Sequence, residues 1–191
     1  MAKHGGGHEA AAYRLMLWQY RLQDLLHLDP PEPHLAQAPI RPGMTVVDYG
    51  CGPGRYAVPL AQRVGPSGKV YAVDIQPLAI EAVRKRIARA GLANVEPILV
   101  DSYRTPIAAD SVDLVVLLDT FHAIGDRPAL LQEIHRLLKP DGLLFMDPGH
   151  MPMAEAREAV EGSGLFRVKQ TDGKHMLVEP MRGKRGVNPD T

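Results

Sequence analysis

The hydrophobic positions of this 191-residue chain follow two alternating patterns from residue 45 onward. Short runs of consecutive apolar residues are separated by segments in which apolar residues return every three or four positions. Runs of about four to eight apolar residues are typical of strands buried on both faces, and the second pattern is typical of amphipathic helices. Repeated strand–helix–strand units of this kind predict an α/β fold with a doubly wound, mostly parallel sheet. The expected strands are 45–50, 69–75, 95–101, 112–119 and 143–149, and the expected helices are 55–65, 77–91 and 127–140.

The pattern shortens after residue 149. Residues 153–164 predict one more helix, and residues 165–180 predict two strands joined by a turn that contains Asp172 and Gly173. The C-terminal part therefore adds two strands to the sheet.

Several element boundaries are marked by particular residues. Pro77 lies where a first helical position is expected, and Gly91 lies where that helix should end. Asp126 can cap the helix that the sequence LKPDG terminates. Pro59 lies within about one turn of its helix start, where a missing N–H costs little.

The first 40 residues carry a different pattern. Residues 9–28 predict a helix with two apolar stripes, one with Tyr13 and the other with Trp18, so more than one side must be covered. This helix is either a lid over the site or the interface of a homodimer. Prolines between residues 30 and 42 predict an extended connector. The expected regions are the helix and connector at 1–40, a domain at 41–181 and a flexible tail at 182–191.

Charge and composition limit the partners. The 22 basic and 22 acidic residues give no net charge, so neither nucleic acid nor an anionic membrane surface is expected as a partner. The longest apolar runs, such as 114–118, are far shorter than the roughly 18 residues of a membrane-spanning helix. Cys51 is the only cysteine, which excludes an internal disulfide, and the N-terminus has no apolar secretory signal. We expect a soluble, cytoplasmic protein.

Three glycines spaced two residues apart follow the first expected strand, in the sequence VVDYGCGPG. Gly50, Gly52 and Gly54 lie in the first strand-to-helix turn, where sheets of this kind contact a phosphate or a nucleoside. Glycine is needed for a tight turn or where a ligand touches the main chain. A nicotinamide dinucleotide fingerprint requires G-x-G-x-x-G, whose third glycine position falls here on Arg55. The spacing therefore favours a ligand other than a nicotinamide dinucleotide.

Two carboxylates at strand ends extend the expected ligand site. Asp74 ends the second strand, where a carboxylate can accept hydrogen bonds from both hydroxyls of a ribose. Asp101 ends the third strand and is placed to bond an exocyclic amine such as that of adenine. Together they predict a ligand that contains a nucleoside.

These residues resemble the motifs of class I S-adenosylmethionine-dependent methyltransferases. VVDYGCGPG resembles the first motif of that family, AVDI the acidic second-strand motif and VDS the third, and SVDLVVLLDTFH with LLKPDGLLFMD resembles the motifs of the fourth and fifth strands. The resemblance spans roughly residues 40 to 180 and is greatest to small-molecule methyltransferases of the ubiquinone, menaquinone and arsenite type. It implies a Rossmann-like, seven-stranded sheet whose last strand, about 174–180, is antiparallel and lies beside the fifth. The paired cysteines of an arsenite enzyme and the inserted lid of larger relatives are absent.

The resemblance also implies a role for each matching residue toward S-adenosylmethionine, with a small molecule as methyl acceptor. The methionine part would be surrounded by residues of the first motif, the ribose and adenine by the second and third motifs, and the end of the fourth strand would lie beside the cofactor. In that order, the implied cofactor-binding residues are Asp48, Gly50, Cys51, Gly52 and Gly54, then Asp74 and Ile75, then Asp101 and Ser102, and Asp119.

Histidines near the same edge are candidates for the chemistry. His122 is either a structural histidine or the base that takes a proton from a weakly acidic acceptor, and we predict it as the base. Asp119, Asp147 and His150 could bind a divalent metal as in catechol-type methyltransferases, but the usual ligand pattern is not evident, so no metal is predicted. Cys51 is expected to be a small buried residue and not a nucleophile.

Two other functions stay open. A non-catalytic S-adenosylmethionine-binding partner or sensor would keep the glycine loop but need no acceptor pocket. An oxidoreductase with a dinucleotide is disfavoured by the glycine spacing.

Overall fold

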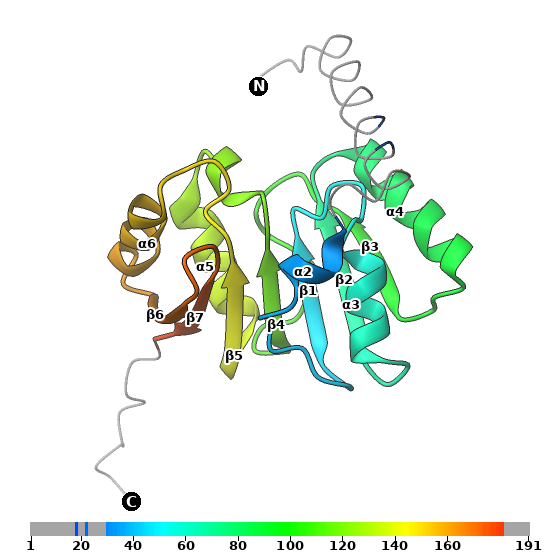
Figure 1. Cartoon of the computed structure of the whole chain (residues 1–191), viewed down its shortest axis with the longest axis horizontal. Helices are drawn as coiled ribbons and strands as arrows, with labels where there is room; N and C mark the ends of the chain where they lie inside the picture. The colour runs from blue at the N-terminus through cyan, green and yellow to red at the C-terminus, as the bar shows by residue number, and fades with distance from the viewer. Residues whose placement is uncertain (1–17, 19–21, 23–29, 182–191) are drawn as a thin grey trace, which may run out of the picture.

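A seven-stranded sheet forms the centre of the molecule (Figure 1). The computed structural model describes Trp18, Leu22 and residues 30–181. The strands lie in the order β3-β2-β1-β4-β5-β7-β6, and only β7 runs antiparallel to its neighbours β5 and β6. The predicted Rossmann-like sheet with one antiparallel strand inserted beside the fifth is therefore confirmed. The strands are β1 (Thr45–Tyr49), β2 (Lys69–Asp74), β3 (Val95–Leu99), β4 (Val112–Leu117), β5 (Leu138–Met146), β6 (Phe166–Thr171) and β7 (Met176–Pro180).

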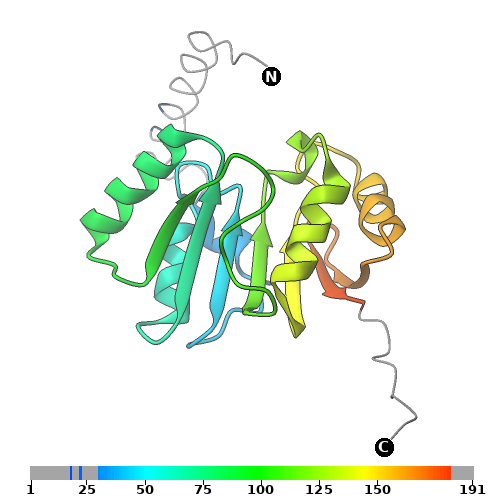
Figure 2. The same ribbon diagram turned by 180° about the vertical axis from the view of Figure 1, so that it is seen from behind.

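Helices cover both faces of this sheet, as Figures 1 and 2 show from opposite sides. One face carries the short helix α2 and the helices α3 and α4, and the other carries α5 and α6. The helices are α2 (Pro31–His34), α3 (Ala57–Val64), α4 (Pro77–Ala90), the 3₁₀ turn η1 (Phe121–Ala123), α5 (Arg127–Leu137) and α6 (Met153–Gly162).

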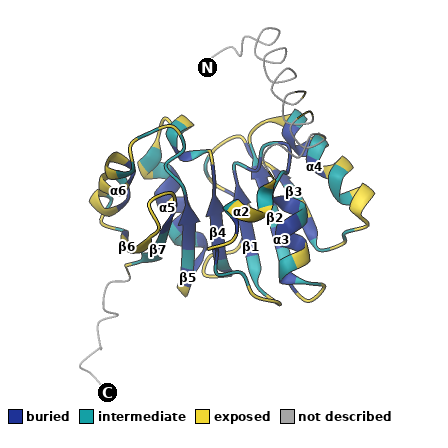
Figure 3. Ribbon diagram, viewed as in Figure 1, coloured by how far each residue is buried: buried dark blue, intermediate teal, exposed yellow. Residues whose placement is uncertain are grey.

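Alternation along the strands divides the core into two layers. Val46 and Val47 of β1 are both fully buried but belong to different layers, because successive strand residues point to opposite faces. Val46 lies in the layer that contains Leu60 of α3, and Val47 in the layer that contains Leu130 of α5. Figure 3 shows the central strands buried and the outer helix faces exposed. Burial on both faces explains why these strands are continuous apolar runs.

The predicted boundary residues of two helices are confirmed. Pro77 is the first residue of α4, and Gly91 ends it in the left-handed conformation with φ of 63°. The Asp126 side chain accepts a hydrogen bond of 3.0 Å from the Ala129 N–H at the start of α5.

The other predicted ranges shift by a few residues at their ends, and two differences have a clear structural cause. Helix α5 ends at Leu137, and β5 already begins at Leu138, because Leu138 is extended and pairs with Val112 of β4. Pro140 contributes, since a residue before proline disfavours helical backbone. The connector is also not wholly extended: residues 31–34 form the one-turn helix α2, which is followed by the fully buried Leu35. The Arg63 guanidinium of α3 donates a 2.5 Å hydrogen bond to the Leu35 carbonyl and fixes this turn to the domain.

Trp18 and Leu22 are the described residues of the N-terminal segment. Both are helical, and their exposed fractions are 61% and 37%. Tyr13, the rest of the predicted lid or interface helix and the predicted tail at 182–191 lie outside the described residues, so those roles stay predictions. Within the described part of the chain, no helix is long and apolar enough to cross a membrane.

Candidate functional site

A cavity of about 530 Å³ lies at the carboxyl ends of β1 to β4. The chain reverses its strand order between β1 and β4, and open α/β sheets bind ligands at such a switch point. Eight of the ten predicted cofactor residues line this cavity: Gly50, Cys51, Gly52, Asp74, Ile75, Asp101, Ser102 and Asp119. Asp48 and Gly54 do not line it, and neither does His122.

The three glycines of the loop serve different purposes, although all have positive φ. A Cβ on Gly50 would lie 2.4 Å from Thr120 Cγ2, and one on Gly54 would lie 2.8 Å from Val83 Cγ2 of α4. These two glycines are therefore needed for close packing within the protein. A Cβ on Gly52 would meet no atom within 4 Å. Because Gly52 lines the cavity, its missing side chain leaves room for a ligand against the backbone.

Asp74 ties the glycine loop to the end of β2. Its Oδ2 accepts a 2.8 Å hydrogen bond from the Gly52 N–H, and its Oδ1 accepts one of 2.8 Å from the Gln76 N–H. Burial raises the pKa of Asp74, and the backbone N–H groups of Gln76 and Gly52 oppose this rise by stabilising the carboxylate. Each oxygen keeps a further lone pair, so the carboxylate can also accept from ligand hydroxyls. The same side chain positions the loop and offers an acceptor to the cavity.

Asp48 lies beneath the loop and is 2% exposed. Its Oδ2 has no hydrogen-bond partner among the described residues. Burial, and then the neighbouring Asp74 carboxylate, raise the pKa of Asp48 from 3.8 to about 7. Burial at this position therefore favours the neutral acid over the carboxylate.

Cys51 is 4% exposed and belongs to the same core layer as α3. Burial raises the pKa of its thiol, and the nearby Asp48 and Asp74 carboxylates raise it further. A thiol that resists ionisation is a poor nucleophile, which agrees with the predicted packing role.

The cavity also has lining residues that sequence reasoning missed. Most of them directly follow a strand or a predicted site residue, and that position is the signal by which they could have been found. They are Tyr49, Pro53, Arg55, Tyr56, Val100, Tyr103, Leu118, Thr120, Ala123 and Ile124.

A hydrogen-bond pair fixes the loop after β3 against the end of β1. The Tyr49 hydroxyl donates a 2.5 Å hydrogen bond to the Tyr103 carbonyl, and the Tyr103 hydroxyl accepts one of 3.2 Å from the Asp126 N–H. The loop that carries Asp101 and Ser102 is thereby held between β1 and α5.

A buried carboxylate anchors the same loop further along. Glu133 of α5 is 4% exposed and accepts hydrogen bonds from the N–H and the hydroxyl of Thr105, at 2.9 and 2.8 Å. Arg136 donates to it from Nη2 at 2.6 Å. Burial alone would raise the pKa of Glu133, but the hydrogen bonds from Arg136 and Thr105 hold it below its usual value. This network was not predicted, although Glu133 falls on the apolar face of its helix.

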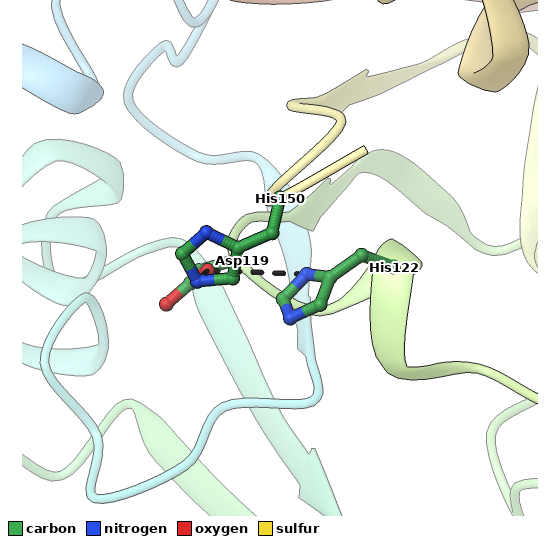
Figure 4. A group of neighbouring side chains, drawn as sticks. All are labelled: Asp119, His122 and His150. Atoms are coloured by element: carbon green, nitrogen blue, oxygen red, sulfur yellow. Dashed lines mark ion pairs between the residues drawn. The ribbon is translucent and has the colours of Figure 1, made fainter. Parts of the chain in front are cut away.

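A cluster of Asp119, His122 and His150 lies next to the cavity (Figure 4). Nδ1 of His122 and Nε2 of His150 lie 4.0 and 3.9 Å from Asp119 Oδ1. The two imidazole rings are 4.7 Å apart between centroids. Asp119 also lines the cavity, so the cluster adjoins the ligand space.

Asp147 supports this cluster and is not part of it. Its Oδ1 accepts 2.9 Å hydrogen bonds from the N–H groups of Asp119 and Gly149. Burial raises the pKa of Asp147, and these two hydrogen bonds oppose the rise. The sequence suggested Asp119, Asp147 and His150 as possible metal ligands. In the structure, His122 and not Asp147 lies with Asp119 and His150.

Comparisons with known proteins agree with this geometry. A family model described as a methyltransferase domain matches residues 40–175. Nocamycin O-methyltransferase from Saccharothrix syringae is 36% identical over 118 residues, which are 62% of this chain and 42% of that protein. Demethylmenaquinone methyltransferase from Geobacillus kaustophilus is 29% identical over 61% of this chain and 50% of its own length. The chain thus spans half or less of the length of these curated relatives.

A solved structure is similar over most of its length. The SAM-dependent methyltransferase from Aquifex aeolicus is 30% identical to this chain and superposes with a TM-score of 0.68. The match covers 78% of this chain and 86% of that one.

Proposed function

Because this chain belongs to the family of methyltransferase domains, we propose that it binds S-adenosylmethionine in the cavity and transfers the cofactor's methyl group to a small-molecule acceptor. One observation carries the proposal: Gly52 faces open space in the cavity while its N–H is held by the ribose-binding candidate Asp74. An accessible backbone at Gly52 and the hydrogen-bond-accepting carboxylate of Asp74 therefore lie together at the edge of the sheet where a nucleoside is expected.

The lining residues support one orientation of the cofactor. We place the methionine part along Gly50, Cys51 and Gly52, and the ribose at Asp74. The adenine then lies toward Asp101 and the other residues that follow β3. Ile75, which is 63% exposed, offers an apolar surface beside that end of the cavity.

The chemical class of the methyl acceptor is inferred from the relatives. Their names describe methyl transfer to nocamycin and to demethylmenaquinone, which supports a small organic acceptor. An arsenite acceptor is disfavoured because Cys51 is the only cysteine of the chain and is buried. Space beside Asp119, Thr120, Ala123 and Ile124 is where we place the acceptor.

The protein's contribution to methyl transfer is positioning. When bound, S-adenosylmethionine would supply an electrophilic methyl carbon that the acceptor attacks in line with the breaking C–S bond, with S-adenosylhomocysteine as the leaving group. The rigid glycine loop and the anchored loop after β3 hold the two reactants in line, and such positioning contributes roughly 7 to 11 kcal/mol to a barrier. His122 as the base stays a prediction; its neighbours Ala123 and Ile124 line the cavity, while its own side chain does not.

Methyl transfer is tested directly with metabolite extracts. We expect the protein, given S-adenosylmethionine, to produce S-adenosylhomocysteine and one metabolite heavier by a methyl group, as measured by mass spectrometry. Asp74→Ala should lose this activity at limiting cofactor, because both the loop anchor and the ribose acceptor are removed. Cofactor binding without any product across a broad acceptor panel would instead support the non-catalytic binding module.

A further inference from the structure

The cluster of Asp119, His122 and His150 has the donor set of a metal centre. One atom from each of these three side chains lies within 4.8 Å of the other two. Ligands around one ion at about 2.0 to 2.2 Å are separated by roughly 3 to 3.5 Å, so the cluster needs only a small contraction. Asp119 and His150 are exposed on the surface beside the cavity, with exposed side-chain fractions of 50% and 83%.

His122 supplies a second observation. Its Nδ1 is buried and has no hydrogen-bond partner among the described residues, although it faces Asp119 at 4.0 Å. A buried nitrogen without a partner costs about 1 to 3 kcal/mol, and a bound cation would remove that cost. Gly149 packs closely against the imidazole, because a Cβ at this position would lie 2.0 Å from the same nitrogen.

The backbone around the cluster holds the ligands together. Asp119 has φ of 51°, a left-handed conformation uncommon for a residue other than glycine. Asp147 bonds the N–H groups of Asp119 and Gly149 through a single oxygen, which joins the loop after β4 to the loop after β5. His122 and His150 come from these two loops, so the link sets their separation.

We propose that Asp119, His122 and His150 bind one divalent transition-metal cation beside the cavity. Two imidazoles and one carboxylate favour zinc, iron, cobalt or nickel, whereas magnesium and calcium prefer oxygen ligands. Three protein ligands leave coordination positions open for water or for an oxygen of the acceptor. A cation there would occupy Nδ1 of His122, so this histidine would be a metal ligand and not the base.

Metal binding is measured on untagged, chelator-treated protein, with Zn²⁺ by calorimetry and Co²⁺ by its visible absorption. We expect one ion per chain and no competition from Mg²⁺. His122→Gln, His150→Gln and Asp119→Asn should each weaken binding about tenfold or more. Asparagine is chosen for Asp119 because it tolerates left-handed backbone. His135→Gln and Asp141→Asn are matched controls outside the cluster and should leave binding unchanged.

His150→Gln decides the proposal even if another variant fails to fold, since the side chain is exposed and does not line the cavity. It should bind Zn²⁺ at least about tenfold more weakly while keeping wild-type affinity for S-adenosylhomocysteine, so the metal site and the proposed cofactor site are tested separately. No Zn²⁺ binding by the wild type, or binding by His150→Gln as tight as that of the wild type, would overturn the metal site.

Discussion

Gly52→Ala is expected to weaken binding of S-adenosylhomocysteine by about thirtyfold or more, which corresponds to ~2 kcal/mol. The added methyl group would enter the space that we assign to the ligand, because no protein atom beyond the adjacent residues lies within 4 Å of its position. The loss of stability should be small, about 1 to 2 kcal/mol, since only the left-handed backbone at φ of 50° opposes alanine. Calorimetry and thermal unfolding measure the two effects separately.

Gly91→Ala is the matched control for this variant. Gly91 also has positive φ, of 63°, and a Cβ there would likewise meet no atom within 4 Å, but it ends α4 away from the cavity lining. The control should lose similar stability and keep wild-type affinity. Equal affinities for Gly52→Ala and the wild type would mean that the ligand does not approach this backbone.

Asp48→Asn is expected to stabilise the ligand-free protein by about 1 to 3 kcal/mol at pH 8. Below pH 3.8 the Asp48 carboxyl is protonated in both the folded and the unfolded chain and does not affect stability. Between 3.8 and about 7 the unfolded chain releases this proton first, so the free energy of unfolding falls by about 1.4 kcal/mol per pH unit. Above pH 7 the loss is complete, at about 4 kcal/mol. Asparagine cannot ionise and therefore removes this loss of stability. The buried amide that it introduces is itself unfavourable and offsets part of the stabilisation.

Chemical denaturation at pH 5 and pH 8 isolates the effect of the Asp48 charge. The stability difference between Asp48→Asn and the wild type should be about 2.5 kcal/mol larger at pH 8, because the amide cost is the same at both values. Asp141→Asn, at an exposed carboxylate, should show no such change. A difference that is the same at pH 5 and pH 8 would show that Asp48 is not a buried acid with a raised pKa.

The apolar runs predicted the sheet well because both faces of its strands are buried. The hydrophobic pattern could not predict where α5 ends. That boundary is set by the pairing of Leu138 with Val112, which is distant in the sequence. Leu35 was missed for a related reason, since its burial depends on α3 packing against the connector.

The site was predictable where its residues directly follow strands. Asp74 and Gly52 were found in this way, and the structure joins them by a hydrogen bond. Spacing could not distinguish Gly52 from Gly54, because only the packing of Val83 from α4 shows that Gly54 faces the protein. The sequence also could not show that His122 and His150 are in contact, because their contact depends on the pairing of β4 with β5.

A calorimetric titration of the purified protein tests whether this cavity holds S-adenosylmethionine. The protein should bind S-adenosylhomocysteine at one site per chain with micromolar or tighter affinity, and it should give no heat of binding with NAD. Micromolar binding of NAD with no response to S-adenosylhomocysteine would show that the cavity is not an S-adenosylmethionine site.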